Sequence, residues 1–227
     1  MINILLSTYD FSNKYCYSKL KNILQPHMNA IILPFSHDEE YYKKEYLFND
    51  LYNYETGKNY NIICNEFRQY GIEKSSIYVL NPFRDSLEYM KYKINNADIM
   101  FGVGGNPIIF MDMLKKLKIL EDVKKFKSIF MGASASAMVQ VEQFFTYYLP
   151  WEPYEYEYYE GLGYVKGIDV IVHWTNNEWQ DIAKIISHIE RRIPYVNLPD
   201  GECLIFNNSI AKGFAVFTDF IQVSTCL

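Results

Sequence analysis

A serine in a turn of small residues is the first candidate for chemistry in this chain. Residues 128–138 read SIFMGASASAM, so an apolar run meets Gly, Ala and Ser before a helix-compatible stretch. This layout is typical of a nucleophile elbow, in which a strand turns sharply into a helix and displays one side chain, here Ser134. Bulky neighbours would clash where the strand end packs on the helix start. An ordinary strand-to-helix turn is the alternative interpretation.

A serine hydroxyl is a weak nucleophile until a base takes its proton and donors stabilise the oxyanion. His173 is the candidate base because it ends the apolar run 170–172, at the carboxyl end of a predicted strand, where ligand sites of open α/β sheets gather. A capping or core histidine is the alternative. His27 and His37 lie in early connections, and His188 lies within a predicted helix.

A glycine-rich segment is the candidate source of backbone donors. Residues 101–107 read FGVGGNP, again between a predicted strand and a predicted helix. Consecutive glycines let backbone N–H groups approach a substrate oxygen closely, and the helix start adds favourable potential for negative charge. A tight turn that needs positive φ is the alternative. The segment lacks G-x-G-x-x-G and a Walker lysine, which disfavours a phosphate site.

The elements that must position these residues alternate between strands and helices. Helical spacing of apolar residues predicts helices over 107–120 and 177–191. Such alternation implies a parallel sheet covered on both faces. The predicted strands cover residues 3–6, 30–33, 77–80, 98–103, 128–131 and 169–173.

The last 33 residues have a different pattern, in which short strands are split by turns. We expect them to form an antiparallel ribbon at the sheet edge, and we interpret Asp200 in Pro-Asp-Gly as a turn residue. Residues 36–76 are charged and Tyr-rich and predict surface helices. No flexible boundary frames them, so residues 1–227 form a single expected domain. The short strands cover 195–198, 203–206, 211–217 and 220–224.

Composition excludes several classes of protein. Hydrophobic residues make up 49% and charged residues 22%, which favours a packed core. The net charge of −5 argues against a nucleic-acid partner, and no apolar run reaches the roughly 18 residues of a membrane helix. The N-terminus predicts a strand and not a secretory signal. Scattered cysteines disfavour zinc and disulfides, so we expect a cytoplasmic protein. The cysteines are Cys16, Cys64, Cys203 and Cys226.

These segments, taken in order, resemble the peptidase S51 family, which contains the aspartyl dipeptidases (peptidase E) and the cyanophycinases. The similar strings are ADIMFGVGGNP at 97–107, GASASAM at 132–138 and VIVH at 170–173, and the resemblance covers roughly residues 95–206. It implies an α/β fold like the class I glutamine amidotransferases, which is flavodoxin-like. In that fold a mostly parallel central sheet carries helices on both faces, and here antiparallel hairpin strands would follow at the C-terminus.

The resemblance also implies roles for individual residues. Ser134 would be the nucleophile, and His173 would be the general base and then the acid toward the leaving amine. The backbone N–H groups of Gly105 and Ala135 would form the oxyanion hole. The family places its acid between nucleophile and histidine, where Glu152 stands 18 positions after Ser134.

Three further residues are candidates for substrate contact. Gly104 would shape the donor turn, Asn106 matches the family's Gly-Gly-Asn and would fix that loop, and Trp174 directly follows the candidate base. No Arg or Lys follows His173 before position 184, so a preference for aspartyl peptides is not expected.

The resemblance therefore implies a serine hydrolase that cleaves a small peptide or amide through an acyl-enzyme, without metal or organic cofactor. One departure is Ser136, which stands where the family usually has Gly. The alternative function is a catalytically inactive relative that binds a small molecule or a protein partner. The aromatic segment 144–159 would then serve as a binding surface; a substrate platform and a homodimer contact are its other interpretations.

Overall fold

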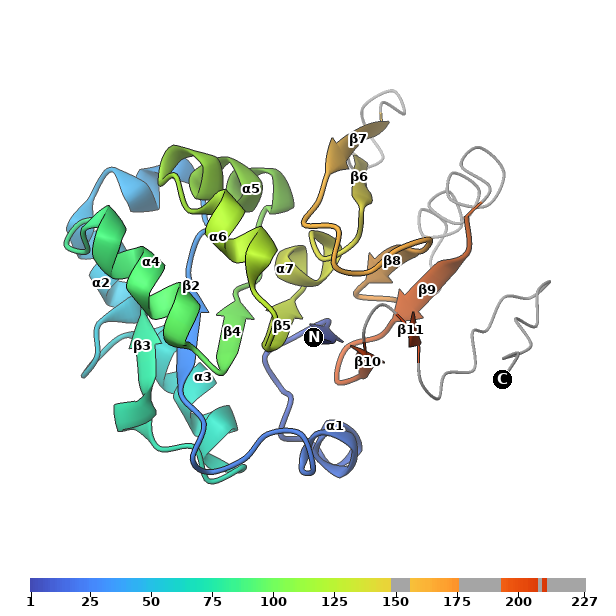
Figure 1. Cartoon of the computed structure of the whole chain (residues 1–227), viewed down its shortest axis with the longest axis horizontal. Helices are drawn as coiled ribbons and strands as arrows, with labels where there is room; N and C mark the ends of the chain where they lie inside the picture. Colours follow the sequence, from blue (N-terminus) through green and yellow to red (C-terminus); the bar gives the residue numbers. More distant parts are fainter. Residues whose placement is uncertain (148–155, 176–192, 208–209, 212–227) are drawn as a thin grey trace.

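The computed structural model describes residues 1–147, 156–175, 193–207 and 210–211. Its centre is a seven-stranded sheet in which five neighbouring strands are parallel (Figure 1). The order of these five is β1 (Ile2–Leu6), β5 (Ile129–Ala133), β4 (Ile99–Gly102), β2 (Ala30–Leu33) and β3 (Ile77–Val79). Beside β1 lie β10 (Cys203–Asn207) and then β11 (Ile210–Ala211), both antiparallel to their neighbours. The predicted fold class is confirmed.

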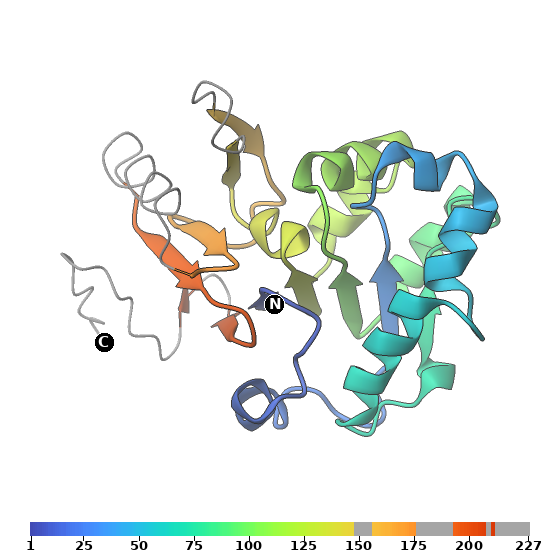
Figure 2. The same ribbon diagram turned by 180° about the vertical axis from the view of Figure 1, so that it is seen from behind.

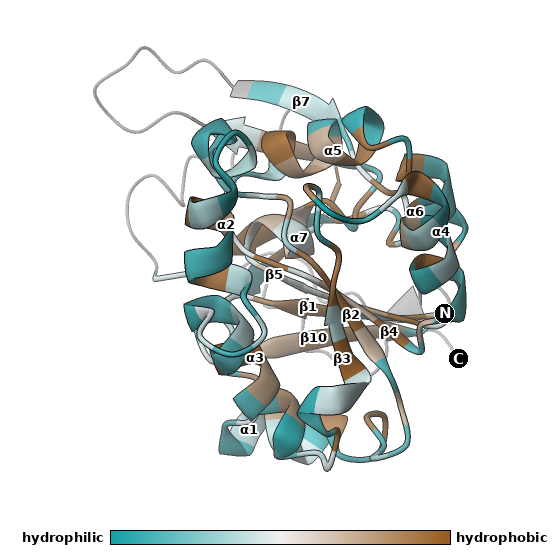
Figure 3. Cartoon of the chain, turned by 90° about the vertical axis from the view of Figure 1, so that its left-hand side faces the viewer, coloured by the Kyte–Doolittle hydropathy of each residue, from teal (hydrophilic) through white to brown (hydrophobic). Residues whose placement is uncertain are grey.

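Helices cover both faces of the sheet, as Figure 3 shows in a view that places α3 and α4 on opposite sides. One face carries α1 (Lys14–Leu20), α2 (Glu45–Tyr52) and α3 (Lys58–Arg68). The other carries α4 (Leu87–Asn96), α5 (Pro107–Lys116), α6 (Leu120–Lys125) and α7 (Ala135–Met138). Two short 3₁₀ turns, η1 (Glu39–Tyr42) and η2 (Lys74–Ser76), complete the connections before β3.

The two apolar cores explain why the central strands read as short apolar runs. In β1, Ile4 packs toward α1–α3 while Leu5 packs toward α4–α7; in β4, Phe101 and Met100 divide in the same way. All four side chains are fully buried. Side chains alternate between the faces of a strand, and helices cover both faces of a parallel sheet, so consecutive residues must all be apolar.

The connection between the sheet and its C-terminal strands differs from the prediction. We expected residues 169–173 to join the parallel sheet and 195–198 to enter an antiparallel ribbon. Instead β8 (Asp169–Val172) pairs in parallel with β9 (Tyr195–Leu198) as a separate two-stranded sheet. The free edge of β1 is already paired with β10, so β8 and β9 pair with each other.

A hairpin of β6 (Gln143–Tyr147) and β7 (Tyr156–Glu160) precedes β8. Figure 2, seen from behind, shows β6–β9 on the side of the molecule away from β3. Phe144 stacks on Tyr159, with ring centroids 5.6 Å apart. Part of the aromatic segment therefore packs on itself, and the rest of that segment, residues 148–155, lies outside the described residues.

The predicted helix 107–120 is wrong in its last four residues. α5 ends at Lys116, Lys118 adopts φ 57°, and α6 begins at Leu120. The turn brings the Ile119 N–H to the Leu114 carbonyl at 3.0 Å and buries Ile119 completely, which a straight helix would not require. The predicted helix 177–191 and the strand 220–224 lie outside the described residues. Among the described helices, none combines the length and apolar character of a membrane span.

Candidate active site

The carboxyl ends of three parallel strands meet at one place. Leu6 of β1 is in register with Ala133 of β5, and Gly102 of β4 is in register with Gly132. The next residue after β5 is Ser134, whose φ of 50° and ψ of −111° are unusual for a residue with a side chain. Such a strained backbone conformation costs about 1–3 kcal/mol, and strained residues of this kind cluster at functional sites. Ser134 is partly exposed although its neighbours are buried, so the turn displays its side chain.

Only small residues fit around the elbow. A Cβ on Gly132 would lie 2.1 Å from the Ser136 carbonyl oxygen, and a Cβ on Gly102 would lie 2.5 Å from the Ser136 Cβ. Ser136 is fully buried and donates a hydrogen bond from Oγ to the Val103 carbonyl at 2.6 Å. The departure from the family's Gly is therefore accommodated, because Gly102 leaves room for the extra side chain.

His173 stands at the end of β8 and points at the elbow. Its Nε2 lies 2.9 Å from the Ser134 Oγ, and its Nδ1 lies 2.7 Å from the Asp200 Oδ1. A carboxylate only accepts hydrogen bonds, so we assign the proton of the neutral ring to Nδ1, which leaves Nε2 as the acceptor for the Ser134 hydroxyl. This is the arrangement of a nucleophile, a base and an orienting acid.

Among the described residues, Asp200 is the acid that contacts His173. Asp200 lies in the turn between β9 and β10, where Gly201 has φ 77° and the Asn13 side chain donates to the Gly201 carbonyl at 2.9 Å. Glu152 lies outside the described residues, so the carboxylate that contacts His173 belongs to a residue that we interpreted only as part of a turn. Asp200 follows the histidine in the chain, whereas the resemblance placed the acid before it, so sequence order gave no reason to select Asp200.

The Asp200 carboxylate is held in its charged form. Desolvation raises the pKa of Asp200, but hydrogen bonds from Ser7 and His173 together outweigh it and lower the pKa below the ordinary value. The His173 and Asp200 side chains are 48% and 61% exposed. Solvent therefore screens the interaction between the two side chains, which reduces the effect expected when either one is substituted.

Ser7 is a member of the site that sequence reasoning missed. It is buried directly after β1, donates from Oγ to the Asp200 Oδ1 at 2.8 Å and accepts the His173 backbone N–H at 2.7 Å. Ser7 thus fixes the side chain of Asp200 and the backbone of His173, which has a φ of 53°. Its position at the carboxyl end of a predicted strand was the signal that could have identified it.

The glycine loop lies against the nucleophile. A Cβ on Gly104 would lie 3.3 Å from the Ser134 Cβ, and Gly105 has φ 142°, with space for a Cβ blocked by the Ser36 carbonyl oxygen at 2.1 Å. The backbone N–H of Gly104 donates to the Tyr9 hydroxyl, and the backbone N–H of Asn106 donates to the Ser36 carbonyl. Within the described part of the chain, the Gly105 N–H has no such acceptor.

The second predicted donor is the N–H of Ala135, in the first turn of α7. The first four N–H groups of a helix have no intrahelical acceptor. Gly105 lines the same cavity as Ser134, whereas Ala135 directly follows Ser134 and is not among the lining residues. Both N–H groups stay candidates for the two donors of an oxyanion hole.

A cavity of about 310 Å³ opens over these groups. Gly104, Gly105, Ser134 and His173 line it, together with Ser7, Thr8, Tyr9 and Ala133. Asn106 and Trp174 are not among its lining residues. The Asn106 side chain instead caps α5 by accepting the N–H groups of Ile108 and Ile109, and the Trp174 N–H donates to the Leu198 carbonyl. Among the described residues, no group of three or more His, Cys, Asp or Glu side chains could hold a metal ion.

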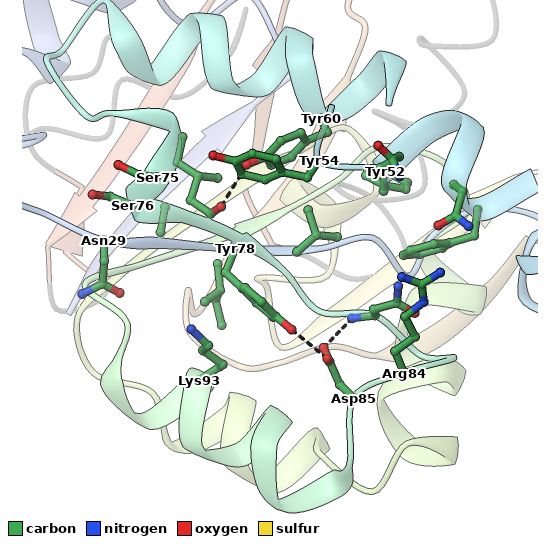
Figure 4. Close-up of a pocket in the computed structure, with 18 of the residues that line it drawn as sticks. Asn29, Tyr52, Tyr54, Tyr60, Ser75, Ser76, Tyr78, Arg84, Asp85 and Lys93 are labelled. Carbon is green, nitrogen blue, oxygen red and sulfur yellow. Dashed lines mark hydrogen bonds between the residues drawn. The ribbon is translucent and has the colours of Figure 1, made fainter. Parts of the chain in front are cut away.

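A larger cavity of about 590 Å³ lies at the other edge of the sheet, along β3. Tyrosines, including Tyr54, Tyr60 and Tyr78, face it from several elements (Figure 4). Its one aspartate, Asp85, accepts the Tyr78 hydroxyl and the Asn81 N–H. No histidine lines it in the described part of the chain, so it lacks the serine–histidine pair of the smaller cavity.

Comparisons with known proteins identify relatives of the fold and the family of the chain. Two solved structures share the fold at low identity: the "putative peptidase E protein" of Listeria monocytogenes EGD-e (14% identity, TM-score 0.57) and a peptidase from an acI-B1 Actinobacterium (15% identity, TM-score 0.59). Each alignment covers 90% of this chain, with 93% of the Listeria chain and 82% of the actinobacterial chain. A search of curated proteins finds no match.

The family comparison covers the glycine loop, the elbow, the histidine and Asp200 together. The model of peptidase family S51 matches residues 57–213, which is more than half of the chain. The chain therefore belongs to peptidase family S51.

Proposed function

We propose that this protein is a serine-type peptidase that cleaves a small peptide or amide through an acyl-enzyme on Ser134. The observation that carries the proposal is the continuous contact from the Ser134 Oγ to His173 and from His173 to Asp200, at 2.9 and 2.7 Å. These distances lie within hydrogen-bond reach of a nucleophile, a base and an orienting acid.

In the proposed reaction, the Ser134 Oγ attacks the substrate carbonyl carbon while His173 Nε2 takes the hydroxyl proton. The carbonyl oxygen becomes an oxyanion that accepts the N–H groups of Gly105 and Ala135. His173 then gives its proton to the leaving amine, and the C–N bond breaks to leave an ester on Ser134. Water, deprotonated by His173, hydrolyses that ester and restores the serine. Asp200 stabilises the imidazolium that forms in both steps.

The substrate class follows from the cavity. Its volume of about 310 Å³ is at the lower end of ligand pockets, which favours a short peptide. No described lining residue is a lysine or arginine, so no cation there would pair with an aspartate side chain. We therefore propose a small peptide without an acidic residue at the cleaved position as the substrate.

The alternative is a catalytically inactive relative that binds a small molecule or a protein partner. Ser136 in place of the family's Gly would favour it. The space that Gly102 leaves for Ser136 and the contact of Asp200 with His173 instead support the peptidase.

The test is labelling with a fluorophosphonate, read by intact mass, together with hydrolysis of a mixture of dipeptides and tripeptides. Wild type should gain one adduct and cleave members of the mixture, and Ser134→Ala should do neither. Ser128→Ala is the control, because it removes an exposed serine hydroxyl that precedes the same strand and does not line the cavity, and it should still be labelled. A labelled Ser134→Ala, or a wild type that is neither labelled nor active, would refute the proposal.

A further inference from the structure

The peptide unit between Val103 and Gly104 is held at both ends by side-chain hydroxyls. Its carbonyl accepts hydrogen bonds from Ser36 at 2.8 Å and from Ser136 at 2.6 Å. Its N–H donates to the Tyr9 hydroxyl at 3.0 Å. The next N–H along the chain is that of Gly105, the proposed oxyanion donor. The orientation of this unit therefore sets the direction from which the Gly105 donor is presented.

Tyr9 differs from the two serines in its location. Ser36 and Ser136 are buried, whereas Tyr9 lines the cavity that contains Ser134 and His173. Its ring packs against Phe101 of β4, with centroids 6.0 Å apart. The Tyr9 hydroxyl thus approaches the glycine loop from the substrate side.

A polar network lies beside the Tyr9 hydroxyl. The Tyr9 and Tyr52 side chains are close enough for each to shift the pKa of the other. The Tyr52 hydroxyl also contacts His37 Nε2 and accepts a hydrogen bond from the Asn59 side chain at 3.3 Å. Tyr52 belongs to α2 and lines the larger cavity at the far side of the network (Figure 4). Four side chains therefore connect the glycine loop to the helix layer behind it.

The network is uncharged at neutral pH. Burial raises the pKa of Tyr9 more than its hydrogen bonds lower it, and burial also raises the pKa of Tyr52. Burial lowers the pKa of His37, which keeps its ring neutral. A neutral hydroxyl can hold the Gly104 N–H without placing a negative charge beside the oxyanion.

We propose that Tyr9 is a positioning residue of the oxyanion hole, which acts by holding the Gly104 N–H so that the Gly105 N–H faces the reacting carbonyl. This inference rests on the proposed function, because the oxyanion hole has a role only if Ser134 attacks a carbonyl. Tyr9 itself moves no proton in the reaction.

The experiment compares Tyr9→Phe with Tyr60→Phe. Tyr60 is the control because its hydroxyl also bonds to the backbone, here by donating to the Ile77 carbonyl at 3.0 Å, and because Ile77 lies on the opposite edge strand of the sheet. Each variant should lower Tm by about 2–4 °C, since each loses one hydrogen bond. Only Tyr9→Phe should lower kcat, by about 10- to 100-fold with little change in KM. Loss of a whole oxyanion donor costs about 10²–10³-fold, and a misdirected donor retains part of that effect.

Amide hydrogen exchange gives a second measurement that does not require turnover. Peptides spanning residues 102–110 should exchange faster in Tyr9→Phe than in wild type, and should be unchanged in Tyr60→Phe. Unchanged exchange in Tyr9→Phe would overturn the inference whether or not the enzyme is active. A wild-type kcat in Tyr9→Phe, or an equal loss in both variants, would overturn it while the Ser134 mechanism stands. If wild type is neither labelled nor active, the proposed function fails, and the positioning role in the oxyanion hole falls with it.

Discussion

The substitution Asp200→Asn tests the assignment of the orienting acid. His173 Nδ1 and Ser7 Oγ both lie within hydrogen-bond distance of the same oxygen, Oδ1 of Asp200. An amide oxygen at that position can still accept both hydrogen bonds. The substitution therefore removes the negative charge while it keeps the tautomer and the orientation of the histidine.

The magnitude follows from the exposure of the pair. A charge-assisted hydrogen bond is roughly twice as strong as a neutral one, so the amide forfeits about 1–1.5 kcal/mol in the bond to the histidine. The imidazolium that forms in the transition state loses a carboxylate at hydrogen-bond distance. Because both side chains are about half exposed, we take this Coulomb loss as only about 1 kcal/mol. The sum of about 2–2.5 kcal/mol corresponds to a roughly 30- to 70-fold lower kcat.

The assay is the rate of fluorophosphonate labelling of Ser134, followed by kcat on a peptide from the cleaved mixture. Glu202→Gln is the control, because it removes a carboxylate two positions further along the same connection, and it should react like wild type. A rate for Asp200→Asn within twofold of wild type would refute the reasoning. So would a large loss in Glu152→Gln, which would restore the acid that sequence order indicated.

Two other predictions concern the elbow and the buried network. Gly102→Ala should lower the free energy of unfolding in urea by about 2 kcal/mol or more, because the new Cβ would lie 2.5 Å from that of Ser136. In a Ser136→Gly background the same substitution should cost less. Additive effects of the two substitutions would contradict this contact. The pKa of His37 is lowered by burial, so the unfolded chain binds its proton more readily and stability should fall as pH drops below about 6.5. His37→Gln should reduce that fall, which is at most about 1.4 kcal/mol per pH unit for one proton. The measurement is the urea midpoint at pH 7.5 and at pH 5.5. The same change of midpoint in wild type and in His37→Gln would exclude the effect.

Several elements were predictable because their signals are local. The apolar run of 129–131 and the small residues after it predict a strand and a tight turn, since bulk is excluded within a few residues of Ser134. The same holds for the loop at Gly104 and Gly105. The helix after Asn106 was also predictable from spacing, but its end was not. The turn at Lys118 is stabilised by burial of Ile119, which depends on the rest of the core.

The sequence by itself determined the fold class, the elbow serine and the histidine at a strand end, because each depends on residues adjacent in the chain. Only the tertiary structure decided which carboxylate and which hydroxyl complete the site. Ser7, His173 and Asp200 come from three distant segments, and 166 positions separate Ser7 from His173. Pairing of β1 with β10 and of β8 with β9 brings those segments together, and contacts set by strand pairing leave no spacing signal in the chain.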